Sequence, residues 1–252
     1  MKLQAFLPLV TYTDPNADAV AANAAAVAAL IGADLNALAV NVTIPQVSNA
    51  LSRFLLDVPD MIRQAEATSR GHGERLLAAV KAAGEAAQVT VATETVVETP
   101  PLLSATAALA ARYHDIALIG WEEQNPTSRT TAESVVFGSG RPVVLLPETL
   151  DAAAFDHVAI AWDGSRVAAR AAADARPFLA RARRVSVLTV VDEKPLAAED
   201  GERLAASLRR AGLEAEAVKL TGRNAAVART LQEGALERGC GLLAMGGYGH
   251  SR

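Results

Sequence analysis

Short apolar runs alternate with longer segments of helical periodicity along the chain. In the first part, the apolar runs 3–11, 35–42, 88–97, 116–120 and 142–146 predict strands, and the segments 14–31, 53–67, 74–87, 100–112 and 131–137 predict helices. Strands separated by helices are typical of βαβ units, because parallel strands need a long crossover connection. The pattern therefore predicts an α/β fold built on a parallel sheet.

Two local features refine the predicted helices of this first part. Asp14 is placed to cap the first helix, with Pro15 at the first helical position, where the missing N–H of proline costs little. The glycine-containing segment Arg70–Gly73, which includes His72, is predicted to be a loop between two separate helices.

The same order of elements starts again in the second part of the chain. The apolar runs 158–162, 185–191, 214–220 and 242–245 predict further strands, and the segments 165–181, 199–211 and 224–238 predict the helices between them. This is the pattern of a duplicated domain rather than of a short solenoid repeat. We therefore predict two tandem, doubly wound, Rossmann-like domains, 1–147 and 155–252, joined by a linker at 148–154.

The two halves align best at their fourth strand. Residues 111–120 lie over 237–246, with Gly120 opposite Gly246 and a matching apolar pattern throughout. The second half lacks a counterpart of 124–146, which contains the closing strand of the first half. On the logic that each half needs that strand, we expect the natural gene product to continue by about 20 residues beyond Arg252.

Composition narrows the function classes. The chain is 51% hydrophobic and 21% charged, so it can bury a core, and its net charge of −4 argues against general nucleic-acid binding. Cys240 is the single cysteine, which excludes an intrachain disulfide and fits a reducing compartment. No apolar stretch approaches the length of a membrane span, and no secretory signal opens the chain, so a cytoplasmic protein without membrane contact is expected.

The clearest candidate chemistry lies at the end of the chain. The last predicted strand runs directly into Gly246-Gly247-Tyr248-Gly249, a glycine-lined turn that can bring backbone N–H groups close to an anion. A following helix N-terminus adds a favourable dipole. His250 is either a phosphate contact or an exposed loop residue.

A second candidate follows the first strand of the second half. The Asp163 carboxylate in Asp163-Gly164-Ser165 can accept hydrogen bonds from a ribose hydroxyl or an adenine amino group. The same tripeptide is also ordinary helix-capping chemistry, and Ser165 fits a cap better than a ligand contact. The two roles of Asp163 are compatible.

The matching turn of the first half is different. In the register above, Glu122 replaces Tyr248 and Glu123 replaces Gly249, and Trp121 precedes them. Carboxylates that point into a poorly solvated phosphate site repel a nucleotide by several kcal/mol. We therefore expect that the first domain has lost nucleotide binding. The alternative is that the two carboxylates hold a metal that bridges to phosphate.

These segments resemble a tandem universal stress protein, with two UspA-type domains in one chain. The resemblance rests on 158–165, 187–192 and 245–251. It implies a parallel α/β fold of the adenine nucleotide alpha hydrolase type. It also implies binding of ATP, with or without Mg²⁺, through a motif Gly-x2-Gly-x9-Gly-(Ser/Thr), of which Gly246 and Gly249 supply the first half. The same resemblance places Asp163 and the backbone of Val190 at the nucleotide.

The leading hypothesis is a stress-response module that binds ATP or a related adenine nucleotide in its second domain, without efficient catalysis. No Gly-x-Ser-x-Gly elbow or Walker-type Gly-Lys-(Ser/Thr) is present. The alternative is an interaction protein in which neither domain binds nucleotide, and which acts through packing of the two sheets as an intramolecular pseudo-dimer or through a homodimer. Slow ATP hydrolysis is a third hypothesis.

Overall fold

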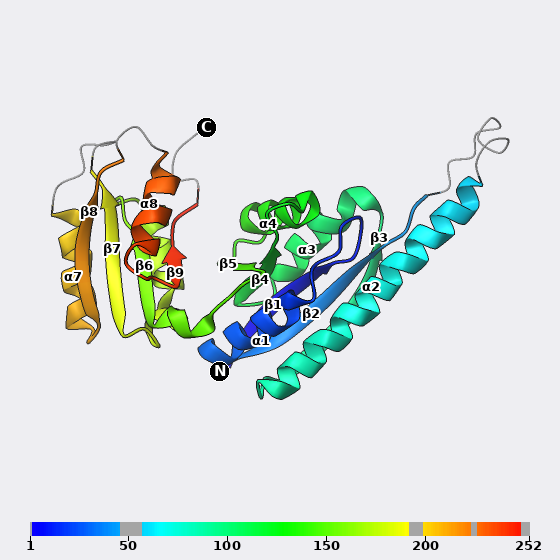
Figure 1. Cartoon of the computed structure of the whole chain (residues 1–252), viewed down its shortest axis with the longest axis horizontal. Coiled ribbons are helices and arrows are strands. Elements are labelled where there is room, and N and C mark those ends of the chain that lie inside the picture. The colour runs from blue at the N-terminus through cyan, green and yellow to red at the C-terminus, as the bar shows by residue number, and fades with distance from the viewer. Residues whose placement is uncertain (1, 46–56, 192–198, 223–225, 248–252) are drawn as a thin grey trace. The chain divides into compact units, whose positions relative to one another are not determined.

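The computed structural model describes residues 2–45, 57–191, 199–222 and 226–247 (Figure 1). The chain divides into two compact units, Met1–Leu150 and Asp151–Arg252, each built on its own parallel sheet flanked by helices. The predicted α/β fold class is therefore confirmed. None of the helices in the described residues is long and apolar enough to cross a membrane.

The first sheet has the strand order β3-β2-β1-β4-β5, and every adjacent pair is parallel. Its strands are β1 (Leu3–Val10), β2 (Ala33–Val42), β3 (Val91–Glu98), β4 (Ile116–Trp121) and β5 (Val143–Pro147). The order reverses between β1 and β4, which makes their carboxyl ends the topological switch point, where open α/β sheets bind ligands.

The second sheet repeats this arrangement with the order β8-β7-β6-β9 among the described residues. Its strands are β6 (His157–Ala161), β7 (Arg184–Val190), β8 (Glu214–Leu220) and β9 (Leu242–Ala244). Phe6 pairs with Ala117 in the first sheet, and Ala159 pairs with Leu243 in the second. The alignment of Gly120 with Gly246 makes Ala117 and Leu243 equivalent, so position 6 corresponds to position 159. The strand pairing extends this correspondence along the other paired strands.

Helices cover both faces of the first sheet. They are α1 (Ala19–Ile31), α2 (Val58–Ala86), α3 (Leu103–Ala111) and α4 (Pro126–Gly138), with a short 3-10 turn η1 (Pro100–Leu102) before α3. Phe6 packs in one cluster with Ala107 of α3 and Val135 of α4. Helix α2 runs along the other face, against β2 and β3 (Figure 1).

The second domain begins with a 3-10 turn η2 (Ala152–Asp156). Its helices are α5 (Arg166–Asp174), α6 (Arg176–Leu179), α7 (Asp200–Arg210) and α8 (Val227–Leu236). The single helix predicted over 165–181 is therefore interrupted at Ala175, ahead of Pro177. Leu231 and Ala235 of α8 pack against Leu188 on one face of the sheet, and Gly201 of α7 lies against Thr189 on the other.

The prediction of two helices separated by a loop at Arg70–Gly73 is wrong. One helix, α2, spans 29 residues and includes this segment, and the predicted start at Arg53 lies outside the described residues. Gly73 is needed for packing rather than for a turn, because a Cβ there would lie 2.5 Å from Asn41 Oδ1 of β2. Glycine lets the helix lie close to the sheet, at a cost of about 1 kcal/mol in helix propensity.

The predicted cap at Asp14 is also wrong, because α1 begins at Ala19. The chain between β1 and α1 is held instead by Asn16. The Asn16 N–H donates to the Val10 carbonyl (3.1 Å), and Asn16 Oδ1 accepts from the Val10 N–H (2.8 Å). These bonds stabilise a loop where the capping pattern of Asp14 and Pro15 predicted the start of a helix.

Helix α4 starts five residues earlier than the predicted helix at 131. Asn125 Oδ1 accepts from the backbone N–H groups of Thr127 and Ser128, both at 3.0 Å, and Pro126 occupies the first turn. An asparagine cap followed by proline is a strong local start signal. The sequence contains this signal, but the apolar periodicity begins only later.

Candidate functional site

The two switch points are equivalent in position but differ in chemistry. The first joins the loops after β1 and β4, and the second joins the loops after β6 and β9. The strand register makes Val10 the counterpart of Asp163, Val40 the counterpart of Val190, and Gly120 the counterpart of Gly246. At the position of Asp163 the first domain therefore has an apolar valine.

Glu122 fills the first switch point. Its side chain is only 9% exposed, and Oε1 accepts hydrogen bonds from Asn16 Nδ2 (3.1 Å) and from the Ala17 N–H (3.0 Å). Oε2 accepts from Asn125 Nδ2 at 2.5 Å. A carboxylate of the chain itself thus occupies the donors of both loops that could otherwise face an anion.

Neighbouring residues fix the loop that carries Glu122. Its backbone N–H donates to Ser128 Oγ (3.2 Å), and that hydroxyl donates to the Gly120 carbonyl (3.1 Å). Trp121 packs against the core cluster formed with α3 and α4, and the Glu123 side chain is exposed. The two carboxylates therefore do not share one environment. No group of three acidic, histidine or cysteine residues that could hold a metal occurs among the described residues.

A backbone carbonyl near the end of β2 in the first domain is also hydrogen-bonded within that domain. The Val40 carbonyl accepts from Thr11 Oγ1 at 2.8 Å. Val40 corresponds to Val190, whose backbone is expected to meet an adenine edge. The first domain therefore satisfies internally both the anion-binding donors and the strand-end acceptor of its switch point.

In the second domain, Asp163 and Ser165 shape the start of α5. Asp163 Oδ1 accepts from the Ser165 N–H (3.0 Å), and Ser165 Oγ accepts from the Ala168 N–H (3.2 Å) as the helix cap. Gly164 adopts a φ of +71°, which favours glycine. The capping role of Ser165 is confirmed. A carboxylate accepts about four hydrogen bonds, so one bond to Ser165 is compatible with contact to a ligand hydroxyl.

Gly246 and Gly247 have different surroundings. A Cβ on Gly246 would lie 2.6 Å from the backbone carbon of Val167 and 2.8 Å from the Ala168 N, so this glycine permits close approach of the first turn of α5. A Cβ on its counterpart Gly120 would instead meet two side-chain atoms, Asn16 Nδ2 and Val20 Cγ2, both at 2.9 Å. A Cβ on Gly247, which aligns with Trp121 of the first domain, would meet no atom of the described residues within 4 Å. Gly249 and His250 lie outside the described residues.

Three side chains near the second switch point were missed by the sequence reasoning. Trp162 Nε1 and Thr189 Oγ1 are buried polar atoms without a hydrogen-bond partner among the described residues. Asp200 Oδ2 would lie 3.7 Å from a Cβ added to Gly164. Asp200 reaches this place through the packing of α7 on the sheet, so spacing along the chain gives no signal for it. Trp162 and Thr189 directly precede Asp163 and Val190 in the sequence. Val190 itself is buried.

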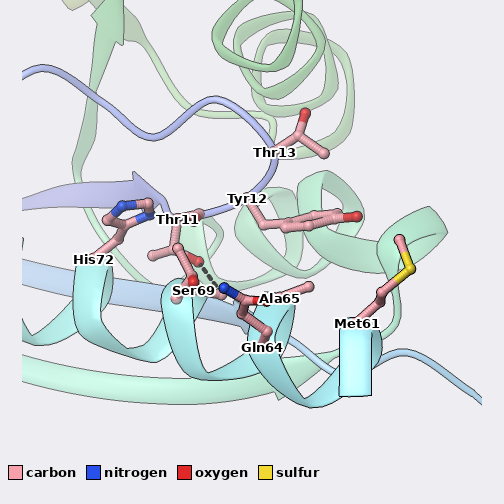
Figure 2. Close-up of a pocket in the computed structure, with 9 residues that line it drawn as sticks. Thr11, Tyr12, Thr13, Met61, Gln64, Ala65, Ser69 and His72 are labelled. Carbon is pink, nitrogen blue, oxygen red and sulfur yellow. Dashed lines mark hydrogen bonds between the residues drawn. The ribbon is translucent and has the colours of Figure 1, made fainter. Parts of the chain in front are cut away.

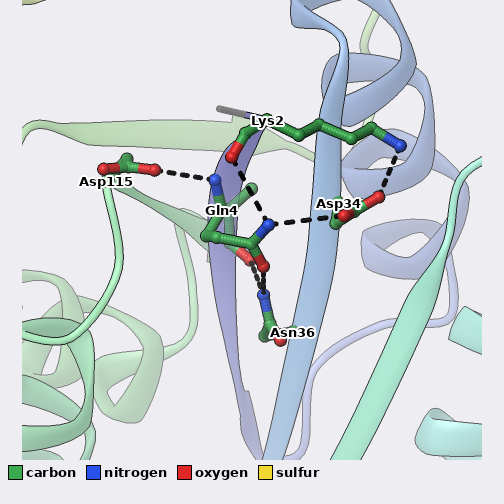
Figure 3. Close-up of polar contacts among 6 residues, drawn as sticks. Lys2, Gln4, Asp34, Asn36 and Asp115 are labelled. Carbon is green, nitrogen blue, oxygen red and sulfur yellow. Dashed lines mark hydrogen bonds and ion pairs between the residues drawn. The ribbon is translucent and has the colours of Figure 1, made fainter.

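The opposite, amino-terminal edge of each sheet carries a polar pair. In the first domain, Asn36 Nδ2 donates to Gln4 Oε1 (3.1 Å), and Gln4 also contacts Asp34 and Asp115 (Figure 3). At the equivalent positions of the second domain, His157 Nε2 lies 2.9 Å from Ser186 Oγ. Ser186 donates to Glu216 Oε1 at 2.8 Å. This order places serine between histidine and glutamate, so the serine proton goes to the carboxylate and the group is not a nucleophilic triad.

Burial and the nearby Arg184 guanidinium lower the pKa of His157. A lowered pKa means that folding favours the neutral ring. The stabilisation is therefore complete above the unfolded pKa of about 6.5 and is lost as the pH falls toward the folded value. Burial also raises the pKa of the Cys240 thiol, which makes it a poor nucleophile.

We expect the second domain to lose stability as the pH falls below about 6.5, the unfolded pKa of histidine, and the variant His157→Gln to lose less. Glutamine can donate a hydrogen bond to Ser186 and does not titrate near neutral pH. The first sheet already has a glutamine, Gln4, at the equivalent position. Urea denaturation followed by Trp162 emission in a Trp121→Phe background measures this domain alone. An identical pH dependence of the free energy of unfolding in both proteins would contradict the assignment.

Comparisons with known proteins now give this architecture a context. A universal stress protein from Archaeoglobus fulgidus DSM 4304 matches with a TM-score of 0.72 and 16% identity, over 98% of this chain and 86% of that chain. UspA from Lactobacillus plantarum matches with a TM-score of 0.39 and 20% identity, over 58% of this chain and 99% of that chain. A universal stress protein in complex with cAMP matches with a TM-score of 0.36 and 17% identity, over 58% and 98%. No family model and no curated protein matches.

The class of the fold follows from the first of these matches, which spans both units. The chain has the α/β, Rossmann-like fold of the universal stress proteins, and its structural neighbours are proteins of that name. At 16% identity the likeness is one of fold, and the chemistry of the two switch points must come from the residues themselves.

Proposed function

We propose that the protein is a universal stress protein whose second domain binds ATP or a related adenine nucleotide, without efficient catalysis. The observation that carries the proposal is the contrast between equivalent positions. Glu122 binds the donors of the first switch point, whereas Gly247 is surrounded by open space among the described residues.

The residues of the second switch point have the chemistry that such a ligand needs. Asp163 supplies a carboxylate for a ribose hydroxyl. Gly246 lets the turn after β9 lie close to the start of α5, and the backbone of Gly247 is available to a phosphate group. The proposed site also includes Gly164 and Ser165, which follow Asp163, and Val190 at the end of β7. From the sequence, we also assign Gly249 and His250 to the site. A bound nucleotide would report the energy state of the cell by shifting the packing of a domain or dimer.

Calorimetry with the full chain tests the proposal directly. We expect ATP to bind with a stoichiometry of one, because Glu122 binds the donors of the first switch point. A Trp121→Phe background leaves Trp162, the neighbour of Asp163, as the single tryptophan, and we expect its emission to change on addition of ATP.

No heat and no change in emission at millimolar ATP would refute nucleotide binding. The interaction-protein hypothesis, in which the domains act through packing with each other or with a second copy, would then stand. Binding of two ATP molecules would refute the asymmetry between the domains. Prolonged incubation with labelled ATP measures any slow hydrolysis in the same samples.

A further inference from the structure

The outer side of helix α3 is apolar although it is exposed. The helix buries alanines, among them Ala107 and Ala111, in the core cluster of the first domain. On its outer side Leu102 is 49% exposed and Leu109 is 52% exposed, with the exposed Ala105 between them. No charged residue occurs from 99 to 111. A surface helix usually has charged or polar residues on its outer side, and a helix that is apolar all round is usually buried.

Two aromatic side chains extend this apolar surface at the C-terminal end of α3. Tyr113, four positions after Leu109, is 86% exposed, and Phe137 of α4 is 53% exposed. The end of α4 lies beside the end of α3, because the carbonyl of Gly138 accepts two hydrogen bonds from the Arg112 guanidinium (3.0 and 2.8 Å). We call the surface formed by Leu102, Ala105, Leu109, Tyr113 and Phe137 the α3 face.

The helix at the same place in the second domain has an ordinary polar outer side. In α8, Arg229 and Glu233 are exposed and form an ion pair at 2.8 Å, and Gln232 between them is also exposed. The two domains share this part of the fold, so the fold itself does not require an apolar outer side. The apolar residues of the α3 face are therefore specific to the first domain.

Helix α2, on the other side of the first sheet, also has a polar outer side. Its inner side contacts the chain after β1, with Ser69 Oγ 2.8 Å from Thr11 Oγ1 and His72 Nδ1 3.1 Å from the Thr11 carbonyl (Figure 2). Its outer side has exposed charges, among them Glu74 and Lys81. Within the first domain, the contrast thus distinguishes α3 from a helix that faces water.

The α3 face is large enough to mark an interaction site. Tyr113 and Phe137 together expose about 200–350 Å², because a buried aromatic side chain covers about 150–250 Å². The exposed parts of Leu102 and Leu109 add to this area. The largest apolar patch of a typical monomer measures about 300–600 Å² and is often functional.

Charged residues flank the α3 face with opposite signs at its two ends. Glu98 ends β3 and the exposed Glu123 follows β4, so both lie at the carboxyl edge of the sheet, where α3 and α4 begin. Arg112 follows α3 and Arg141 precedes β5, so both lie at the opposite edge. The Arg141 guanidinium donates to the Arg112 carbonyl at 3.1 and 2.7 Å, which holds these two exposed residues together. The α3 face therefore has an acidic end, an uncharged middle and a basic end.

This distribution is complementary to itself when two copies meet in opposite directions. A twofold axis between positions 105 and 106 places Leu102 of one copy opposite Leu109 of the other. The same axis places the acidic end of one α3 face near the basic end of the other, whereas a parallel arrangement would bring like charges together. Ala105 lies next to the axis, where its small side chain lets the two helices approach closely.

We propose that the α3 face is an interface between two copies of this chain, in which the two α3 helices pack antiparallel about a twofold axis. Such an axis lets one surface supply both sides of the contact. The leucines and aromatic rings pack in the middle, and the charged ends restrict the pairing to the antiparallel direction. The interface is separate from the nucleotide site proposed for the second domain and does not depend on it.

Sedimentation analysis of the full chain tests the proposal. We expect a dimer whose dissociation constant rises at least tenfold in Leu109→Asp. The matched control is Leu236→Asp, which changes a leucine of α8 that is 67% exposed and should leave the dissociation constant unchanged. Ala105→Arg, at an exposed position of the α3 face, repeats the test if Leu109→Asp does not fold.

The other outcomes overturn the proposal. A chain that stays monomeric at submillimolar concentration has no such interface. A dimer that folded Leu109→Asp leaves intact uses another surface. Leu145→Asp locates one alternative, because Leu145 is 44% exposed on the edge strand β5, and a dimer weakened by this change alone would form through that edge.

Cross-linking tests the direction of the helices. In a Cys240→Ser background, which removes the single native thiol, Ala105→Cys places two thiols next to the twofold axis. Disulfides need Cα atoms about 4.4–6.8 Å apart, and the two copies of position 102 lie about seven residues, or about 10 Å, apart along antiparallel helices. We therefore expect mild oxidation to cross-link Ala105→Cys at least tenfold faster than Leu102→Cys. Equal rates, or faster cross-linking of Leu102→Cys, would overturn the antiparallel arrangement.

Discussion

Replacing Glu122 by alanine is expected to destabilise the first domain by about 2–4 kcal/mol. The substitution removes a buried carboxylate that accepts hydrogen bonds from Asn16, Ala17 and Asn125. Those donors would remain in a poorly solvated loop without their acceptor, and hydrogen bonds to charged groups contribute about 1.5–3 kcal/mol each. Urea denaturation followed by Trp121 emission in a Trp162→Phe background measures the loss.

Two neighbouring variants sharpen this test. Glu122→Gln keeps the shape and one acceptor oxygen, so it should cost less than alanine. Glu123→Ala removes an adjacent but exposed carboxylate and should change the free energy of unfolding by less than about 0.5 kcal/mol. Equal effects of Glu122→Ala and Glu123→Ala would show that Glu122 does not hold the loops together.

Replacing Asp163 by alanine is expected to weaken ATP binding about tenfold to a hundredfold. This corresponds to one hydrogen bond to a charged group, about 1.5–3 kcal/mol. The same change removes the bond to the Ser165 N–H, so the melting temperature must be measured alongside. Asp163→Asn keeps an acceptor for Ser165 and separates loop stability from ligand contact.

Gly247 offers a matched pair of substitutions at the same site. The added Cβ of Gly247→Ala meets no atom of the described residues within 4 Å, so this variant should leave ATP binding nearly unchanged. Gly247→Glu adds a negative charge at the turn and should weaken binding more than tenfold, since like charges about 4 Å apart repel by about 4 kcal/mol at an effective dielectric of about 20. Equal affinities of the two variants would place the phosphates elsewhere.

The parallel sheets could be predicted from the sequence because their signal is local. Each strand is a short apolar run, each crossover is a helix, and the second half repeats the order of the first. The alignment of Gly120 with Gly246 agrees with the strand register, and each glycine lies against the helix that follows the central strand of its own domain, α1 or α5, or against the loop before that helix. The pairing of β1 with β4 and of β6 with β9 follows from that alignment.

The errors arose where contacts between distant segments decide the local structure. Gly71 and Gly73 suggest a loop, but the close approach of α2 to Asn41 favours glycine inside a helix. Asp14 and Pro15 suggest a helix start, but Asn16 and Glu122, which are 106 residues apart, hold that chain in a loop. The sequence indicates an acidic turn in the first domain, yet it could not show that Glu122 accepts hydrogen bonds from the loops of its own domain.

The carboxylate of Glu122 also leads us to expect that ATP stabilises the two domains by different amounts. A solute that binds only the folded state stabilises it by RT ln(1 + [L]/Kd), about 2.7 kcal/mol at a hundredfold excess over Kd. In the first domain the Glu122 carboxylate is already bonded to the donors of the switch point, so we expect no such increment from ATP there. Thermal melting with rising ATP should therefore move one transition upward and leave the other in place, so that the first domain acts as an internal reference for the second.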